Sequence, residues 1–125
     1  MIDSYLSNIE NILNNCSYIE RFKINKQKIN DFSGIISGLV FFNNGILDFL
    51  EVVKISQQNE PIKKKYKYHF RRKDNSLVFR YDNMPHYPNI DSFPHHKHTR
   101  NDIVKCYETE LSLVIREIKD FKFYE

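Results

Sequence analysis

The chain has 125 residues, of which 41% are hydrophobic and 28% charged, so it holds enough apolar material for one packed core and too little chain for two. Its formal charge is only +3 at pH 7, so any case for an anionic partner must rest on where the charges lie. Large multidomain enzymes are excluded, as is a disulfide-rich secreted scaffold, because Cys16 and Cys106 are the two cysteines of the chain.

The sequence predicts neither export nor membrane insertion. It shows no basic segment followed by an apolar run of signal-peptide length, and no stretch approaches the ~20 apolar residues needed to span a bilayer. We therefore expect a cytoplasmic protein with reduced thiols and no membrane partner.

An amphipathic helix is predicted at the start of the chain, followed by a short strand. The helix follows from apolar residues that recur every three or four positions, at Ile2, Tyr5, Leu6, Ile9, Ile12, Leu13 and Cys16. Over residues 21–29 the spacing becomes alternating, with Phe22 and Ile24 on one side and Arg21 and Lys23 on the other.

A hairpin is predicted next, because residues 34–42 and 46–55 are β-branched and aromatic runs joined by Asn43, Asn44 and Gly45. Asn44-Gly45 is a favoured pair for a type I′ turn. With these two residues as the loop, the register places three apolar pairs opposite one another on a core face, namely Phe42 and Leu47, Val40 and Phe49, and Ile36 and Val53.

A second hairpin is predicted after Pro61, with strands at residues 62–72 and 77–82 and a polar turn at 73–76. If Asp74 and Asn75 form the loop, Phe70 faces Phe79 and Tyr68 faces Tyr81. Opposed aromatic pairs stabilise a sheet, which favours this register.

Residues 83–99 hold three of the four prolines and four of the five histidines and are predicted to form a long ordered loop. The chain then ends in a helix whose buried stripe is Leu111, Val114, Ile115, Ile118 and Phe121. The predicted fold class is α+β, with two successive hairpins in a four- or five-stranded antiparallel sheet and the two helices covering one face of it.

The second hairpin also carries an alternating row of basic residues. The odd positions of its first strand are Lys63, Lys65, Lys67, His69, Arg71 and Lys73, which one strand would show to a single side. Same-face residues lie ~6.6 Å apart along a strand, close to the spacing of phosphates on one nucleic-acid strand. The row therefore favours RNA or DNA binding, with a solvated edge strand protected by lysine as the structural alternative.

Groups suited to acid–base chemistry converge beside this row. The register places Arg80 opposite His69 and Asp82 opposite Lys67, next to the segment that contains His86, His95, His96 and His98. A pair of histidines could deprotonate a ribose 2′-hydroxyl and protonate the leaving oxygen, while Lys97 or Arg80 stabilises charge on phosphorus. These parts would suffice for a ribonuclease that needs no metal, so no cofactor is expected.

Two alternatives remain open for the histidines. His96 and His98 could instead bind a divalent transition metal, with His86, Asp82 or Glu51 completing the ligand set. Alternatively, His95 and His96 only fix the shape of a proline-rich loop through hydrogen bonds.

Two blocks of sequence resemble the signature of the TumE family of prokaryotic toxins. They are Arg80-Tyr81-Asp82-Asn83-Met84-Pro85-His86-Tyr87-Pro88 and Phe93-Pro94-His95-His96-Lys97-His98, with Asn43-Asn44-Gly45, Glu51-Val52-Val53 and Tyr66-Lys67-Tyr68-His69-Phe70 in the expected order upstream. Many members carry Ala where this chain has Met84. The resemblance implies a small cytoplasmic toxin that is neutralised by direct contact with an antitoxin, expected to be a DNA-binding protein.

The resemblance points to the signature residues as the site and gives no catalytic mechanism. It marks Arg80, Tyr81, Asp82, Asn83, His86, His95, His96, Lys97 and His98, and more weakly Glu51 and His69. Together with the basic row, it predicts that residues 1–125 are a single TumE-like toxin domain that acts on RNA, as a histidine-based ribonuclease. The alternatives are a non-catalytic nucleic-acid or partner-binding protein and a metal-dependent nuclease, and a homodimer is possible through a sheet edge or face.

Overall fold

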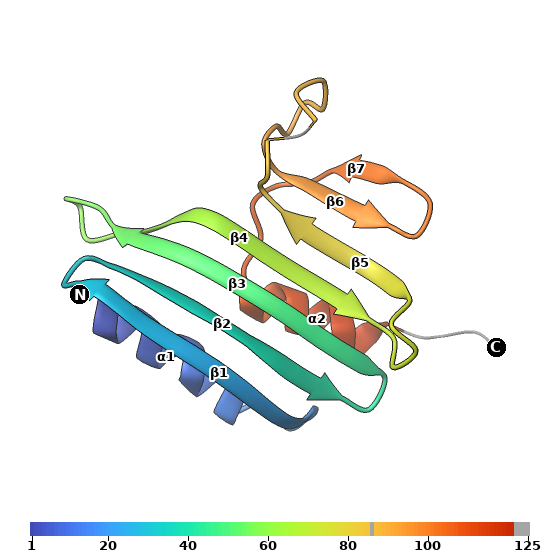
Figure 1. Cartoon of the computed structure of the whole chain (residues 1–125), viewed down its shortest axis with the longest axis horizontal. Helices are drawn as coiled ribbons and strands as arrows, with labels where there is room; N and C mark the ends of the chain where they lie inside the picture. Colours follow the sequence, from blue (N-terminus) through green and yellow to red (C-terminus); the bar gives the residue numbers. More distant parts are fainter. Residues whose placement is uncertain (86, 122–125) are drawn as a thin grey trace.

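In a computed structural model, which describes residues 1–85 and 87–121, two helices and one antiparallel sheet make up the chain (Figure 1). Each strand pairs with the next one along the chain, so the sheet order is β1 to β7. The elements are α1 (Ile2–Asn14), β1 (Ile19–Asn30), β2 (Ser33–Phe42), β3 (Gly45–Ile55), β4 (Pro61–Arg71), β5 (Leu77–Asp82), β6 (His96–Thr99), β7 (Ile103–Lys105) and α2 (Leu111–Asp120).

Both helices lie on the same face of the sheet, behind it in Figure 1. α1 contacts β1, β2 and β3, and α2 contacts β4. The apolar stripes predicted for the helices are buried there, with Ile2, Leu6, Ile9 and Leu13 from α1 and Leu111, Val114, Ile115 and Ile118 from α2. Neither helix has the length and apolar character needed to cross a bilayer.

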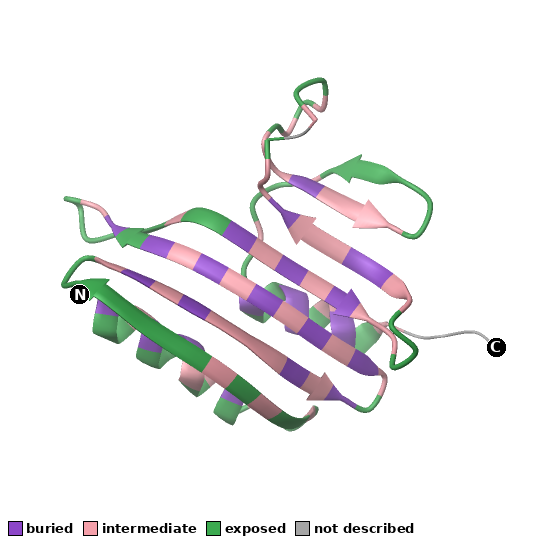
Figure 2. Cartoon of the chain, in the orientation of Figure 1, coloured by how far each residue is buried: buried purple, intermediate pink, exposed green. Residues whose placement is uncertain are grey.

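The strands complete the core with every second side chain, as the alternating colours along β2, β3 and β4 show in Figure 2. Phe49, Tyr68 and Phe70 are fully buried beneath the helices. The side chains between them point to the opposite face, which no described helix covers, and which we call the open face. The predicted α+β class, with both helices on one face, is therefore confirmed.

The prediction of four or five strands is wrong, because the sheet has seven. The short strand expected at 21–29 is present as β1, and the two unpredicted strands lie in and after the histidine segment. β6 runs from His96 to Thr99 and β7 from Ile103 to Lys105, so the segment expected to be a loop as far as Thr99 becomes a strand at His96. Strands of four and three residues are too short to show a clear alternation of polar and apolar residues.

The predicted register of the first hairpin is also wrong, because the turn residues are Asn43 and Asn44. Phe42 pairs with Gly45 and Val40 with Leu47, so each strand keeps the predicted core face but meets partners two positions away. The turn is not type I′, since Asn59 and Asn75 alone have positive φ among the described residues. Gly45 is instead required for packing, because a Cβ there would lie 2.4 Å from the Arg71 carbonyl oxygen.

The register of the second hairpin is confirmed. Phe70 pairs with Phe79 and Tyr68 with Tyr81, and the Phe70 and Phe79 rings lie 5.5 Å apart. The turn closes with Asn75 in the left-handed region at φ 72°, a conformation that asparagine tolerates.

Candidate active site on the open face

Two rows of polar side chains cross β4, β5 and β6 on the open face. In the first row, His69 pairs with Arg80 and Arg80 with His98. In the second, Lys67 pairs with Asp82 and Asp82 with His96. The pairs of His69 with Arg80 and of Lys67 with Asp82 are those predicted. Side chains directly opposite on neighbouring strands lie ~5 Å apart, so the six groups form one compact cluster.

Asp82 is the centre of the cluster and is only 2% exposed. Its Oδ2 accepts a hydrogen bond from Arg80 Nε at 2.8 Å, and its Oδ1 accepts one from the Met84 backbone N–H at 3.0 Å. A carboxylate removed from water needs such donors, and the guanidinium also supplies the opposite charge. Asp82 therefore anchors Arg80 and the chain that leaves β5.

His96 is as buried as Asp82 and is held at both ring nitrogens. Its Nδ1 lies 3.0 Å from the Pro94 carbonyl oxygen, which can only accept, so Nδ1 carries a hydrogen. Its Nε2 lies 2.8 Å from Asp82 Oδ1. The His96 ring therefore bridges the Pro94 carbonyl and the Asp82 carboxylate.

His98 is two positions further along β6 and points to the same face, but it is more accessible. Its side chain is 25% exposed, and its Nε2 lies 3.8 Å from Asp82 Oδ2. The rings of His96 and His98 are 4.8 Å apart, and Tyr87 packs edge-on against both, at 5.0 and 5.8 Å. Tyr87 thus borders the cluster on the side of the 83–95 loop.

His69 occupies the other end of the first row and is half-buried. Burial lowers the pKa of its imidazole below the ordinary 6.5, and the charges of Arg80, Lys67 and Arg71 act in the same direction, opposed by Asp48. At neutral pH the ring is therefore uncharged and able to accept a proton.

Part of the predicted basic row reaches the open face. Lys65, Lys67, His69 and Arg71 pair with open-face residues of β3, and Lys67 and Arg71 lie 3.5 and 3.9 Å from the Asp48 carboxylate. Asp48 was not predicted as part of the site, although its position on the alternating face of the first hairpin would have placed it there.

Lys63 and Lys73 do not belong to this row. A register shift in β4 leaves Lys64 unpaired between Lys65 and Lys63, and this irregularity turns Lys63 to the helix side. There its ammonium donates to the Tyr68 hydroxyl at 3.0 Å and to the Thr109 carbonyl, and burial lowers its pKa. Lys73 lies beyond the end of β4 in the turn.

Lys97 and Tyr81 are also turned away from the cluster, because side chains alternate along a strand. Lys97 lies between His96 and His98, so it points to the helix side, where its Nζ donates to Glu117 Oε2 at 2.8 Å. The Tyr81 hydroxyl donates to the other oxygen of Glu117 at 2.6 Å. Both residues fasten α2 to the sheet.

Three further signature residues have structural contacts elsewhere. The His95 ring stacks on Tyr66 with its Nδ1 2.9 Å from the tyrosine hydroxyl. Asn83 accepts from the Tyr66 N–H and donates to the Lys64 carbonyl, which ties the loop to β4. Glu51 is buried on the helix side, where it accepts from the Tyr5 and Tyr68 hydroxyls. His86 lies outside the described residues.

The cluster also contains one set of groups that fits a metal ion. Among the described residues, a carboxylate oxygen of Asp82 and ring nitrogens of His96 and His98 lie within 4.8 Å of one another. Two histidines and one carboxylate are a common ligand set for divalent transition metals, and the Pro94 carbonyl holds the other nitrogen of His96 as a metal-bound histidine requires.

The fold and the site define a small antiparallel α+β protein with a charged, histidine-containing cluster on the open face, and comparison with known families identifies its family. The family model described as Toxin TumE matches residues 9–122. The chain therefore belongs to the TumE toxin family, which makes it a toxin of a toxin–antitoxin system and implies an antitoxin partner. Searches of curated proteins and of solved structures find no match.

Proposed function

We propose that this toxin cleaves RNA at the open face without a metal ion. The observation that supports the proposal is the row of His69, Arg80 and His98 on three adjacent strands, in which two imidazoles lie on either side of a guanidinium. Cleavage of RNA by transesterification through its own 2′-hydroxyl needs a base, an acid and a cation at the phosphate, and this row offers all three.

In the proposed reaction, neutral His69 takes the proton of the 2′-hydroxyl as its oxygen forms a bond to phosphorus. His98 gives a proton to the 5′-oxygen as the bond from phosphorus to that oxygen breaks. The products are a 2′,3′-cyclic phosphate and a free 5′-hydroxyl, so atoms and protons balance. Arg80, held by Asp82, neutralises the charge that develops on the phosphate oxygens.

The remaining residues act as positioning or binding groups in this proposal. His96 has both nitrogens engaged, so we assign it the role of fixing Asp82, rather than the acid–base role predicted from the sequence. Lys65, Lys67 and Arg71 lie along β4 beside the row and would hold phosphates on either side of the cleaved bond.

A metal-dependent nuclease is the second candidate, favoured by the convergence of Asp82, His96 and His98. These three residues would hold the ion, which supplies a Lewis acid for a phosphate oxygen when bound. In that case His98 binds the metal and cannot serve as the acid.

The two candidates are separated by one experiment. Purified toxin, free of antitoxin, is incubated with a defined single-stranded RNA with and without EDTA, and the products and their termini are resolved on a denaturing gel. We expect cleavage in both lanes, with cyclic phosphate ends. Cleavage lost in EDTA would establish the metal enzyme, and RNA binding without cleavage in either lane would establish a non-catalytic binding protein.

The lowered pKa of His69 predicts the pH dependence of cleavage. Only the neutral imidazole accepts a proton, so on the acid side of the pH profile kcat/KM should rise with pH through a value below the ordinary 6.5. Burial of the ring is the largest cause of the lowered pKa, Arg80, Lys67 and Arg71 lower it further, and Asp48 opposes them. The measurement is a pH profile of the wild type and of Asp48→Asn, whose profile should shift further to acid because the one opposing negative charge is removed. If kcat/KM instead rises with a midpoint at pH 6.5 or above, His69 is not the base.

A further inference from the structure

Beside the proposed site, the open face carries a strip of apolar side chains, which we call the apolar strip. It comprises Ile35, Leu39 and Phe41 on β2 and Ile46, Leu50 and Val52 on β3. These side chains are half-buried by their neighbours on the sheet, and both helices lie on the other face. Two polar residues lie among them on the same face, Ser37 on β2 and Asp48 on β3. An apolar area bordered by polar residues is typical of an interaction surface.

Cations border the strip on both sides. On β1, Arg21 and Lys23 pair with Phe41 and Leu39, and the Arg21 guanidinium lies 4.0 Å from the centre of the Phe41 ring. On the β4 side lie Lys65, Lys67 and Arg71, which belong to the proposed RNA site. Asp48, at the border with β4, is already paired with two of these cations.

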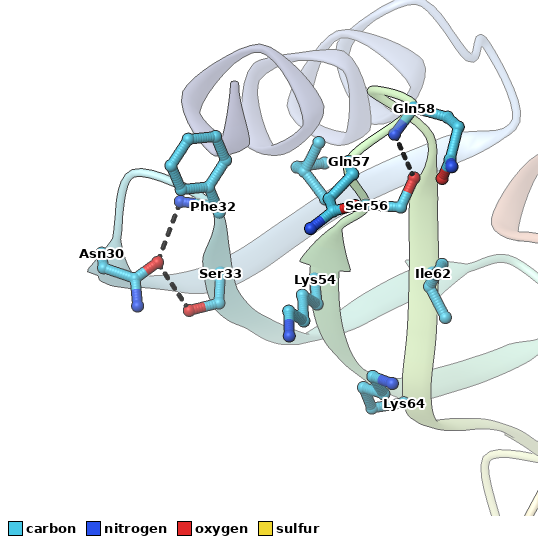
Figure 3. A pocket seen from close by; sticks show the side chains of 10 residues that line it. Asn30, Phe32, Ser33, Lys54, Ser56, Gln57, Gln58, Ile62 and Lys64 are labelled. Atoms are coloured by element: carbon cyan, nitrogen blue, oxygen red, sulfur yellow. Dashed lines mark hydrogen bonds between the residues drawn. The ribbon is translucent and has the colours of Figure 1, made fainter.

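Beyond Ile35 and Val52, the next residues on the open face are Ser33 and Lys54, which line a pocket at the end of the sheet (Figure 3). The pocket has a volume of about 630 Å³, and its lining combines apolar and basic side chains, since Ile62 lies opposite Lys54 and two positions before Lys64. Phe32, which is 48% exposed, lies at its other side.

The composition of the strip favours a polypeptide over RNA as its occupant. Five of its six residues are aliphatic, whereas bases of single-stranded RNA are held chiefly on aromatic rings. Aliphatic side chains between two lines of cations complement a segment that presents apolar residues on one side and carboxylates at its edges.

We propose that an acidic, amphipathic segment of the antitoxin lies along the apolar strip. Its carboxylates would pair with Arg21 and Lys23 on one border and with Lys65, Lys67 and Arg71 on the other. This inference rests on the proposed function in one respect, because a segment so placed covers the cations that hold RNA and thereby inhibits cleavage.

The test uses Leu39→Ser, which shortens one side chain in the strip without changing charge or the proposed catalytic residues. The probe is the antitoxin encoded beside this chain, prepared as recombinant protein and titrated calorimetrically into the purified toxin. We expect binding to weaken at least tenfold, as for a buried residue of an interface. Leu113→Ser is the matched control, since Leu113 is 47% exposed on α2 at the other face, and it should bind as the wild type.

A second pair of variants tests charge independently of packing. Lys23→Glu removes a border cation, whereas Lys26 on the same strand faces α1 and pairs with Glu10, so Lys26→Glu is its control. Only Lys23→Glu should weaken antitoxin binding.

Wild-type affinity in both Leu39→Ser and Lys23→Glu would overturn the proposal. The proposal would also be overturned if the wild-type toxin is a homodimer and Leu39→Ser is a monomer, because a second copy of the chain would then occupy the strip. RNA cleavage is measured separately for each variant. If antitoxin binding depends on Leu39 but the wild-type toxin does not cleave RNA, the apolar strip is the antitoxin site and the proposed function is wrong.

Discussion

Replacing His98 by alanine should slow RNA cleavage by about 10²–10⁴-fold, the usual contribution of a general acid. The ring is accessible and touches Asp82 at the edge of its carboxylate, so its removal leaves the bonds of Asp82 to Arg80 and Met84 in place. Affinity for an uncleavable 2′-deoxy analogue should change little, because the phosphates are held by the cations of β4. Single-turnover cleavage and fluorescence anisotropy measure the two quantities.

His95→Ala provides the matched control for His98→Ala. It removes an imidazole from the same segment, but this ring stacks on Tyr66 rather than facing Asp82. Cleavage should therefore stay within a few fold of the wild-type rate once the variant is shown to be folded. Equal losses in the two variants would mean that the segment is needed only for its shape. A His98→Ala toxin of full activity would remove His98 from the reaction.

The site could be predicted from the sequence wherever a strand was recognised. The pairs of His69 with Arg80 and of Lys67 with Asp82 followed from the register of the second hairpin, which opposed aromatic residues define. The histidine segment was expected to be a loop, in which neighbouring residues can converge. Because it is a strand from His96 onward, alternation brings His96 and His98 to the site and turns Lys97 to α2.

Local irregularities account for the other differences. The register shift that turns Lys63 to the helix side could not be predicted from the sequence. Residues 63–65 are three consecutive lysines, and any of them could be the unpaired residue. The turn of the first hairpin was placed at Asn44-Gly45 because this pair strongly favours a turn. Gly45 instead belongs to β3, where it closely approaches the end of β4, and this packing is a tertiary contact. Such contacts override local preference and are not visible in a single sequence.

Glu51 shows why membership of a signature does not place a residue in the active site. It was expected to support the histidines, but it pairs with Tyr66 on β4 and points to the helix side, whereas Asp82 faces the open side. There it accepts from Tyr68, which is fully buried, and from Tyr5 on α1. Burial, followed by the charge of Glu51, raises the pKa of the Tyr68 hydroxyl, so this group remains a donor. The network joins α1 to β3 and β4.

Glu51→Ala should therefore lower the free energy of unfolding by about 2–4 kcal/mol, because it leaves the Tyr68 hydroxyl without its acceptor and opens a small cavity. This is a large part of the 5–15 kcal/mol typical of a domain, and urea denaturation followed by circular dichroism measures it. Glu60→Ala, at an exposed position before β4, should change stability by less than ~0.5 kcal/mol. At temperatures where Glu51→Ala is folded, its cleavage rate should remain near wild type, since Glu51 is on the other side of the sheet from His98. A stable Glu51→Ala toxin that fails to cleave would instead place Glu51 in the reaction.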